Sequence, residues 1–436
     1  MSLKPGDTKK LEQVEVQSGW ESSTGNSVLE KVKDFIWNPG RMITHFGIYF
    51  CGLWLGIAYV LSTTLSFVFS PWTISPWRVC FGMLLAVGLM LPQDVRHKMS
   101  LLWKAQFRCE PGPQSLDPKY GVGSGLEYEE KTLIFVRHGQ SKGNVLIENA
   151  SYMYRKDKSV LTCWQILLQH FWAELKLLFT SDSQIIDPQL TSKGIKEAQA
   201  LAGFIAKSQQ NPPDWLAGGV AFACSYLRRA AATALISVCS LLEADPAGPP
   251  VVVVPGLAEV SWCPDTIPLA KPRCPPSPKW DDAKAEVALC RRLFAEHYKQ
   301  PVPAKEAGRP QFEKYLHQLF SWTEPTVMMF SHSTHIQVFF QTFLPRPAGV
   351  KQGPGFANTF PKPDPNAGLG FRLQYERMPT GSAVLMKVRR EKRAEGEHFY
   401  VEPSSVQMIF DPSGKYPCSL DLDACAPSSQ PSKQER

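Results

Sequence analysis

Short runs of consecutive apolar residues alternate with longer amphipathic stretches through the middle of the chain. The apolar runs lie at 133–136, 220–224, 251–254, 327–330 and 384–388, and helical periodicity occupies 192–208, 228–242, 281–299 and 311–322. Continuous apolar runs of this length are typical of strands that are buried on both faces. Strands that alternate with helices predict an α/β fold, here a three-layer α/β/α arrangement around a mostly parallel sheet.

The regions on either side of this domain differ from it in composition, and they divide the chain. In chain order we expect a mobile polar leader (1–40), a membrane segment (41–93), a linker with a Pro/Gly-rich second half (94–131), the α/β domain (132–410) with an insert (150–186), and a disordered tail (411–436). The tail is assigned on its few large apolar residues, which cannot form a core.

The membrane segment is almost wholly apolar. Residues 43–69 are long enough to cross a bilayer, which requires roughly 20 apolar residues. A second apolar run, 79–91, is shorter. The pattern predicts that residues 43–91 attach the chain to a membrane, in one span or as a hairpin.

The two topologies place the α/β domain on different sides of the membrane. Basic residues such as Arg41 and Arg96 on both flanks favour a hairpin with a cytosolic domain, because positive flanks stay cytoplasmic. In a single pass the remainder of the chain lies across the membrane. The sequon Asn149-Ala150-Ser151 points weakly to that alternative. We expect a membrane protein with a cytosolic α/β domain.

Composition excludes several classes of protein. A hydrophobic content of 44% and a charged content of 20% are those of a globular chain. The net charge of +7 favours anionic partners, but no dense block of Lys and Arg indicates nucleic acid. The 11 cysteines include no CxxC pair, so no zinc or disulfide framework is expected.

Charged and polar side chains follow four of the predicted strands. The strands end in Arg137-His138, in Arg228-Arg229, in Glu259 and in His332, each within five residues of the apolar run. The carboxyl ends of parallel strands share one edge of a sheet, where α/β folds bind ligands. Together these residues predict a positively charged cup with one carboxylate, which suits a phosphoryl group and a proton donor.

The segments that carry these residues resemble a known family in order and spacing. They are RHGQSKGN at 137–144, DPQLTSKGIKEAQAL at 187–201, SYLRRAAATA at 225–234, LAE at 257–259 and FSH at 330–332. Together they resemble the histidine phosphatase superfamily, the phosphoglycerate mutase-like group. The resemblance covers the α/β domain and leaves out the first 130 residues and the tail.

The resemblance implies a role for each residue. His138 would be the nucleophile that takes the phosphoryl group as phosphohistidine, and Glu259 the proton donor and later the base. The phosphate contacts would be Arg137, Asn144, Arg229 and His332. The register SxLxR selects Arg229 over Arg228, which would face solvent or a salt bridge. Because arginines supply the charge, neither a metal nor a cofactor is expected.

Departures from the family pattern bear on the reaction. The chain has Ser333-Thr334 where the family often has two glycines, and it lacks the Arg-His-Tyr-Gly stretch that follows the acid in mutases. We therefore expect a phosphomonoester hydrolase, acting on a phosphorylated substrate that the sequence does not identify. The alternatives are a phosphoglycerate mutase-type phosphotransferase and a membrane-tethered scaffold without activity.

Other histidines and the insert carry weaker signals. We expect His335 to be a capped histidine in the first turn of a helix rather than a metal ligand. His170, His297 and His317 lie in helical patterns and are expected at the surface. The amphipathic stretch 159–179 of the insert is a lid, a contact with the membrane surface, or a packed helix of a cap, and the sequence leaves these open.

Overall fold

The structure is a computed structural model of the whole chain, and part of the chain is placed well enough to describe. The described residues are 93–107, 127–145, 165, 168–169, 172–177, 180, 182–210, 212–244, 251–260, 264–269, 309–344, 368–393 and 396–418.

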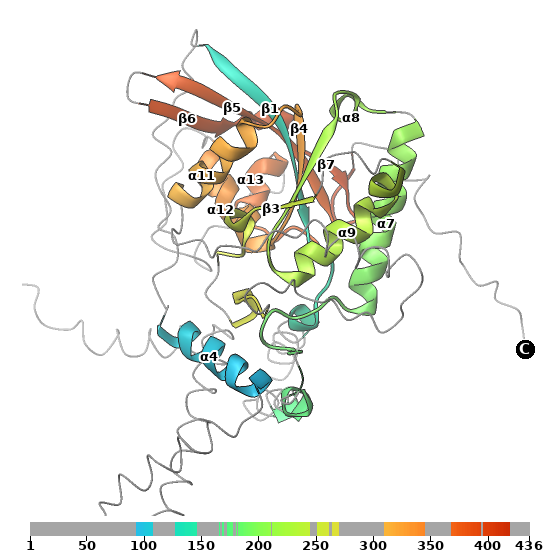
Figure 1. Cartoon of the computed structure of the whole chain (residues 1–436). Helices are drawn as coiled ribbons and strands as arrows, with labels where there is room; N and C mark the ends of the chain where they lie inside the picture. The colour runs from blue at the N-terminus through green and yellow to red at the C-terminus, as the bar shows by residue number, and fades with distance from the viewer. Residues whose placement is uncertain are drawn as a thin grey trace, which may run out of the picture.

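The described residues form one seven-stranded sheet (Figure 1). Its strands are β1 Tyr128–Arg137, β2 Val220–Cys224, β3 Val251–Val253, β4 Thr326–Ser331, β5 Ala383–Arg393, β6 Gly396–Val401 and β7 Gln407–Phe410. Six of them follow the order β3-β2-β4-β1-β5-β6, and β7 pairs with β5. Each of the five apolar runs in the sequence falls on a strand, so these five predictions are confirmed.

The sheet is mixed rather than mostly parallel. β3, β2, β4 and β1 run parallel to one another, whereas β5 is antiparallel to β1, β6 and β7. The expectation of a mostly parallel sheet is therefore wrong for the β5–β7 side. β5 ends at Arg393 and β6 begins at Gly396, and a connection this short permits only antiparallel pairing.

Helices cover both faces of the sheet. The helices of the layers are α7 Ser192–Gln210, α9 Arg228–Ala244, α11 Arg309–Phe320, α12 Ser333–Phe343 and α13 Leu369–Leu373. Figure 1 shows α11, α12 and α13 on one side of the sheet and α7 and α9 on the other. The expected three-layer α/β/α arrangement and the helices predicted at 192–208, 228–242 and 311–322 are confirmed, while the one predicted at 281–299 lies outside the described residues.

Alternation along β1 divides the core into two parts. Leu133 and Phe135 pack in the cluster that contains α11 and α12. Ile134 and Val136 pack in the cluster that contains α7 and α9. All four side chains are fully buried, because successive residues of a strand point to opposite faces of a sheet that is covered on both. The sequence of a strand with both faces covered is therefore a continuous apolar run.

A helix lies where the sequence predicts a linker. α4 spans Gln93–Phe107, and it packs through Lys98, whose Nζ donates to Leu177 O at 2.7 Å. The predicted membrane segment, residues 43–91, lies outside the described residues. Among the described residues, which begin at Gln93, no helix has the length and apolar character needed to cross a bilayer.

The folded domain extends beyond the expected boundary at residue 410. Asp411 and Tyr416 are buried, and the Tyr416 hydroxyl donates to Glu376 at 2.8 Å. Tyr416 belongs to the same core cluster as α11 and α12. Residues 411–418 are therefore part of the domain, and the expectation that the tail begins at 411 is wrong for this stretch.

Candidate functional site

The predicted site residues lie where the parallel strands end. His138 N donates to Ser331 O at 3.0 Å, so the residue after β1 is tied to the last residue of β4. Ser225 N donates to Phe330 O at 2.9 Å, and Val254 N donates to Cys224 O at 2.9 Å. These bonds continue the strand pairing past the strands and bring their carboxyl ends into one row. Figure 1 shows this edge of the sheet on the side of α4.

The backbone after β1 is held against the start of α7. A Cβ on Gly139 would lie 2.4 Å from Gly194 O, and a Cβ on Gly194 would lie 2.1 Å from Gln140 O. Only glycine permits this close backbone approach. Gly139 N also donates to Thr233 Oγ1 of α9 at 3.0 Å. The turn that carries His138 is thus fixed from two helices.

His138 has a defined orientation and tautomer. Its ring is buried, and Nδ1 lies 2.7 Å from Gly139 O. A carbonyl oxygen only accepts hydrogen bonds, so Nδ1 carries the proton and Nε2 has the lone pair. Burial lowers the pKa of His138 well below its ordinary value, and the nearby charges of Arg229 and Arg137 lower it further. The ring is therefore neutral, and the lone pair of Nε2 faces away from the bond to Gly139 O.

Arg229 faces the lone pair of His138. Its Nε donates to His138 Nε2 at 3.2 Å. Nη1 donates to Asp265 O at 2.6 Å, and Nη2 lies 3.3 Å from the Asp265 carboxylate. Asp265 belongs to the 3₁₀ turn η2 (Pro264–Thr266). The sequence marks the proline-rich loop 264–278 as a candidate wall of the substrate cleft, but neither periodicity nor a motif singles out Asp265 within it.

His332 lies beside His138, with 5.1 Å between the ring centroids. Its Nε2 is 2.9 Å from Ser225 Oγ. Nδ1 is buried and has no hydrogen-bond partner within the described part of the chain. Burial is the main cause of a pKa well below the ordinary value, and Arg229 contributes next. A neutral histidine with an unmet ring nitrogen is suited to bind a ligand oxygen.

Glu259 follows the 3₁₀ turn η1 (Pro255–Leu257) and is partly exposed. Its Oε1 accepts from Val260 N at 3.1 Å and from His335 N, in the first turn of α12, at 3.0 Å. Burial raises the pKa of the carboxyl above its ordinary value, Arg229 opposes that shift, and Asp265 adds to it. A carboxyl with a raised pKa holds its proton more readily than an ordinary glutamate.

Arg137 and Asn144 relate to the site in different ways. Arg137 is buried, donates through Nη1 to Met378 O, and contributes its charge to lowering the pKa of His138. Asn144 Oδ1 accepts from Ser141 N at 3.1 Å and from Ser141 Oγ at 2.9 Å. The side chain of Asn144 thus stabilises the turn between Ser141 and Asn144. A contact of Asn144 with phosphate stays a prediction.

The structure decides between the alternatives for Arg228. Its guanidinium is 4% exposed and pairs with Asp182 at 2.7 Å, which confirms the salt bridge. Arg228 also contacts Ser183 and Asp187, so it joins the end of the insert to the first turn of α9. Arg228 therefore has a structural role, whereas its neighbour Arg229 lies at the site.

The remaining histidines lie away from His138 or outside the described residues. His335 is buried in the first turn of α12, with Nδ1 3.0 Å from Ala258 O and Nε2 3.3 Å from the Tyr315 hydroxyl. Burial lowers its pKa to about 3, so it is a neutral structural residue. His317 is half exposed and pairs with Glu397 at 2.9 Å, as expected of a surface residue. His170 and His297 lie outside the described residues.

The insert is described only in part. Its helical stretch at 172–176 contacts α4, where Lys98 pairs with Glu174 at 3.8 Å. Leu168, Trp172 and Leu175 are each more than a third exposed. The three interpretations of the insert stay open.

The described residues do not form a metal site. Within the described ranges no group of three His, Cys, Asp or Glu side chains is placed to hold an ion. The absence of a metal from the reaction stays a prediction, resting on the arginines.

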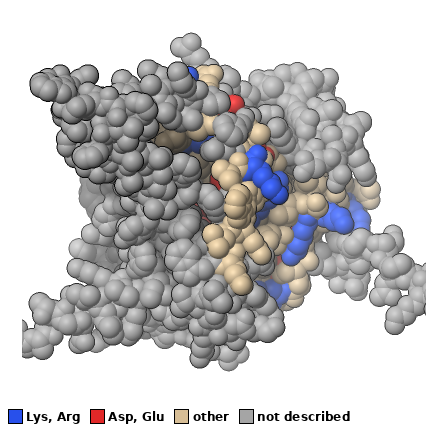
Figure 2. Space-filling model, turned by 90° about the horizontal axis from the view of Figure 1, so that it is seen from below, with Lys and Arg blue, Asp and Glu red and all other residues tan. Residues whose placement is uncertain are grey.

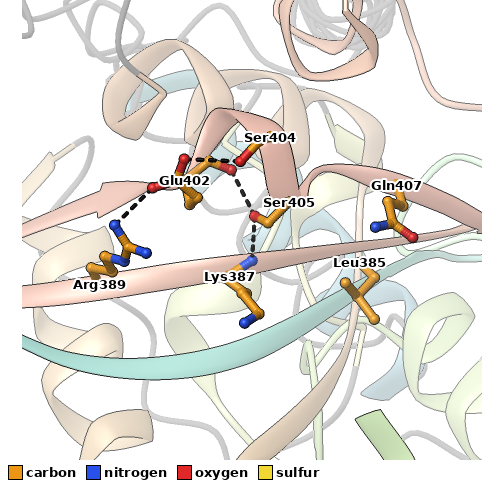
Figure 3. A pocket seen from close by; sticks show the side chains of 7 residues that line it. All are labelled: Leu385, Lys387, Arg389, Glu402, Ser404, Ser405 and Gln407. Carbon is orange, nitrogen blue, oxygen red and sulfur yellow. Dashed lines mark hydrogen bonds and ion pairs between the residues drawn. The ribbon is translucent and has the colours of Figure 1, made fainter. Parts of the chain in front are cut away.

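A pocket of about 530 Å³ is lined by residues of β5, β7 and η3 (Pro403–Ser405) and by Glu402 (Figure 3). Its cations are already paired: Arg389 lies 2.9 Å from Glu130 and 2.8 Å from Glu402. Lys387 lies 2.8 Å from Glu130. The pocket therefore offers little unneutralised charge to a ligand.

Comparison with known proteins gives a weak structural likeness. No family model matches the chain, and no curated protein does. A phosphoserine phosphatase from Entamoeba histolytica, in complex with 3-phosphoglyceric acid, is similar with a TM-score of 0.25 and 12% identity, over 62% of this chain and 94% of that one. A phosphoglycerate mutase from Thermus thermophilus has a TM-score of 0.23 and 13% identity, over 58% and 91%. Scores this low carry no argument about activity.

Proposed function

We propose that the chain is a phosphomonoester hydrolase that acts through a phosphohistidine on His138. The observation that carries this proposal is the unprotonated Nε2 of His138, buried and held 3.2 Å from Arg229 Nε. A neutral imidazole with its lone pair directed at a guanidinium is arranged to attack an atom that carries anionic oxygens. A phosphoryl group fits this description.

In the first step, Nε2 attacks phosphorus and the bond from phosphorus to the leaving oxygen breaks. Arg137 and Arg229 stabilise the charge on the equatorial oxygens, and His332 Nδ1 binds one of them. Glu259 gives its proton to the leaving alkoxide, which departs as the alcohol. The raised pKa of Glu259 supports this role, because the acid must enter the step protonated.

In the second step, Glu259 accepts a proton from water as the water attacks the phosphohistidine. The bond from Nε2 to phosphorus breaks, inorganic phosphate leaves, and the residues return to their starting protonation states. The alternative, a mutase, shares the first step and passes the phosphoryl group to a second alcohol in place of water. Release of inorganic phosphate, measured against formation of an isomeric phosphate ester, separates the two reactions.

We further propose that residues 43–91 attach this domain to a membrane, with the domain in the cytosol. The support is the apolar sequence, which ends two residues before α4 begins at Gln93. Figure 2 shows the molecule from below, and among the described atoms of this face Lys and Arg are more prominent than Asp and Glu. An excess of positive charge suits an anionic membrane surface or an anionic substrate. Protease treatment of sealed, cytosol-side-out vesicles tests the topology, and digestion of the domain only after detergent would contradict it.

The experiment that tests the proposed function is a phosphatase screen of the full chain, with His138→Ala as control. The panel contains phosphosugars, inositol phosphates, phosphopeptides and lipid-derived phosphates. We expect phosphate release from at least one class by the wild type and none by the variant. Equal release by both proteins would contradict the role of His138.

A further inference from the structure

Each of the three nitrogens of the Arg229 guanidinium contacts a group of the protein. Nε donates to His138, Nη1 to the Asp265 carbonyl, and Nη2 faces the Asp265 carboxylate at 3.3 Å. The side chain of Arg229 is 2% exposed. A buried cation without a counter-charge is costly, so the carboxylate stabilises the arginine. The same carboxylate occupies a position that an anionic substrate would need.

The loop that carries Asp265 is anchored several residues away from it. Leu269 N donates to Asp187 Oδ2 at 3.2 Å, and Leu269 O lies 3.1 Å from His97 Nε2 of α4. The side chain of Asp265 is 26% exposed. Rotation of this carboxylate into water therefore leaves the anchors, and the backbone bond from Arg229 to Asp265 O, in place.

We propose that Asp265 determines specificity at this site: its carboxylate occupies Arg229 in the resting protein, and an entering phosphoryl group must displace it. The inference rests on the proposed function, because it assumes that Arg229 receives the phosphoryl group. A phosphomonoester carries close to two negative charges above pH ~6, whereas a phosphodiester carries one. Beside two arginines, replacement of the single charge of the carboxylate by the two charges of a phosphomonoester is favourable. Replacement by the single charge of a phosphodiester is not. Asp265 thus selects phosphomonoester dianions over diesters.

The displacement also preserves the charge around Glu259. The charged groups that act on Glu259 are Arg229, Asp265 and Arg377, and its Oε1 accepts from Val260 N and His335 N. Asp265 raises the pKa of Glu259 and both arginines lower it. A phosphoryl group that takes the place of the carboxylate brings negative charge to the same position, so the pKa of Glu259 stays raised for its proton transfer.

Binding of inorganic phosphate to the full chain, measured by calorimetry at pH 7.5, tests the proposal without turnover. Asp265→Asn keeps the backbone carbonyl and removes the competing charge. We expect phosphate to bind about tenfold more tightly to this variant, which corresponds to about 1.4 kcal/mol. Dimethyl phosphate, a monoanion, should gain measurable binding. Asp214→Asn, in the short helix α8 (Asp214–Ala217) before β2, removes an exposed carboxylate and is the control for net charge.

Phosphate affinity in Asp265→Asn within twofold of both the wild type and Asp214→Asn would overturn the proposal. Should Asp265→Asn fail to fold, Asp265→Ser keeps the same carbonyl and carries the same expectation. In the active protein, Asp265→Asn should lower KM more than kcat and move the alkaline limb of the pH profile to lower pH. If Asp265→Asn binds phosphate more tightly but the wild type hydrolyses no phosphomonoester, the proposed hydrolysis is wrong and the proposed displacement of Asp265 still holds.

Discussion

Strand β1 joins two regions of the molecule that use charge in opposite ways. At its start, on the β5–β6 side, Glu130 and Arg389 lie 2.9 Å apart, and each is about a quarter exposed. At its end, Arg137 and His138 are buried beside Arg229. The first region neutralises every cation of the Figure 3 pocket with carboxylates in contact with water. The second buries two arginines, one of which, Arg229, pairs with the partly exposed carboxylate of Asp265.

The difference favours the strand ends as the region that we propose to bind an anion. Exposed ion pairs contribute at most about 1 kcal/mol each, because water screens them and the partners already satisfy one another. Buried charges are screened much less, so an anion placed beside Arg137 and Arg229 would interact with them more strongly. The charges near the start of β1 are solvated pairs, whereas the strand-end charges are those proposed to bind a phosphoryl group.

The largest expected effect is that of His138→Ala. Removal of the nucleophile should lower kcat by roughly 10⁴-fold or more, as expected when a covalent step is lost. Steady-state phosphate release with the best substrate of the screen is the measurement. His317→Ala, which changes a half-exposed histidine on the β6 side, should stay within twofold of wild type. Comparable losses in the two variants would mean that the chemistry is not confined to the strand ends.

The next effect is that of Glu259→Gln, which removes the proton donor and keeps the shape. We expect kcat to fall roughly 10³-fold for a phosphomonoester with a poorly leaving alcohol, within the usual range for a general acid. In kcat/KM, which reports the first step alone, the loss should be much smaller with a nitrophenol leaving group, which departs without a proton. A loss in kcat/KM that is independent of the leaving group would contradict the role of Glu259 as proton donor.

A related expectation concerns pH. Glu259 must be protonated in the first step and its pKa is raised, so kcat/KM should fall as pH rises through that pKa. His138 has a lowered pKa, so it loses its nucleophilic lone pair only at acidic pH. The profile should therefore be bell-shaped, with the alkaline limb absent in Glu259→Gln. An alkaline limb that persists in this variant would assign it to another group.

Matched arginines test the comparison directly. Arg229→Ala should reduce kcat/KM by roughly 10²- to 10³-fold, the usual range for loss of one transition-state donor. Arg389→Ala should change kcat/KM by less than twofold and the free energy of unfolding by less than about 1 kcal/mol. Kinetics and chemical denaturation of both variants provide the measurements. A large kinetic loss in Arg389→Ala would show that the two regions are coupled.

The smallest effect expected is that of Ser225→Ala. Ser225 lies 2.9 Å from His332 Nε2 and positions that ring. Removal of the hydroxyl should lower kcat/KM by roughly three- to tenfold, corresponding to about 1 kcal/mol for one hydrogen bond. Ser225→Thr should restore most of the activity because it keeps the hydroxyl. Failure of threonine to restore activity would indicate a steric rather than a positioning role.

Much of the site follows from sequence because it lies at the ends of strands that are buried on both faces. The runs before Arg137 and His332 are continuous and apolar, so their carboxyl ends could be placed at one edge. The β5–β7 side could not be foreseen in this way, because β6 has the polar residues Glu397 and His398 near its start and is not a continuous apolar run. α4 also escaped the sequence analysis, since its contacts, such as Lys98 with Glu174, join segments distant in the chain.

Asp265 and Asp187 show a second limit of sequence reasoning. Asp187 has a φ of 45° and is buried, and burial raises its pKa to about 6. Its carboxylate accepts from Arg228 N at 3.0 Å and from Leu269 N at 3.2 Å, which fixes the loop of Asp265 to α9. Both residues act through irregular backbone, which carries no periodicity. Motif spacing identified Arg229 but not the carboxylate that opposes it.

Trapping of the covalent intermediate tests the central claim most directly. The full chain is mixed with a phosphomonoester labelled at phosphorus, quenched, and digested for peptide mapping. The account predicts an acid-labile, base-stable label on the peptide that contains His138, present in Glu259→Gln and absent from His138→Ala. A label on any other residue, or a label that persists in His138→Ala, would contradict it.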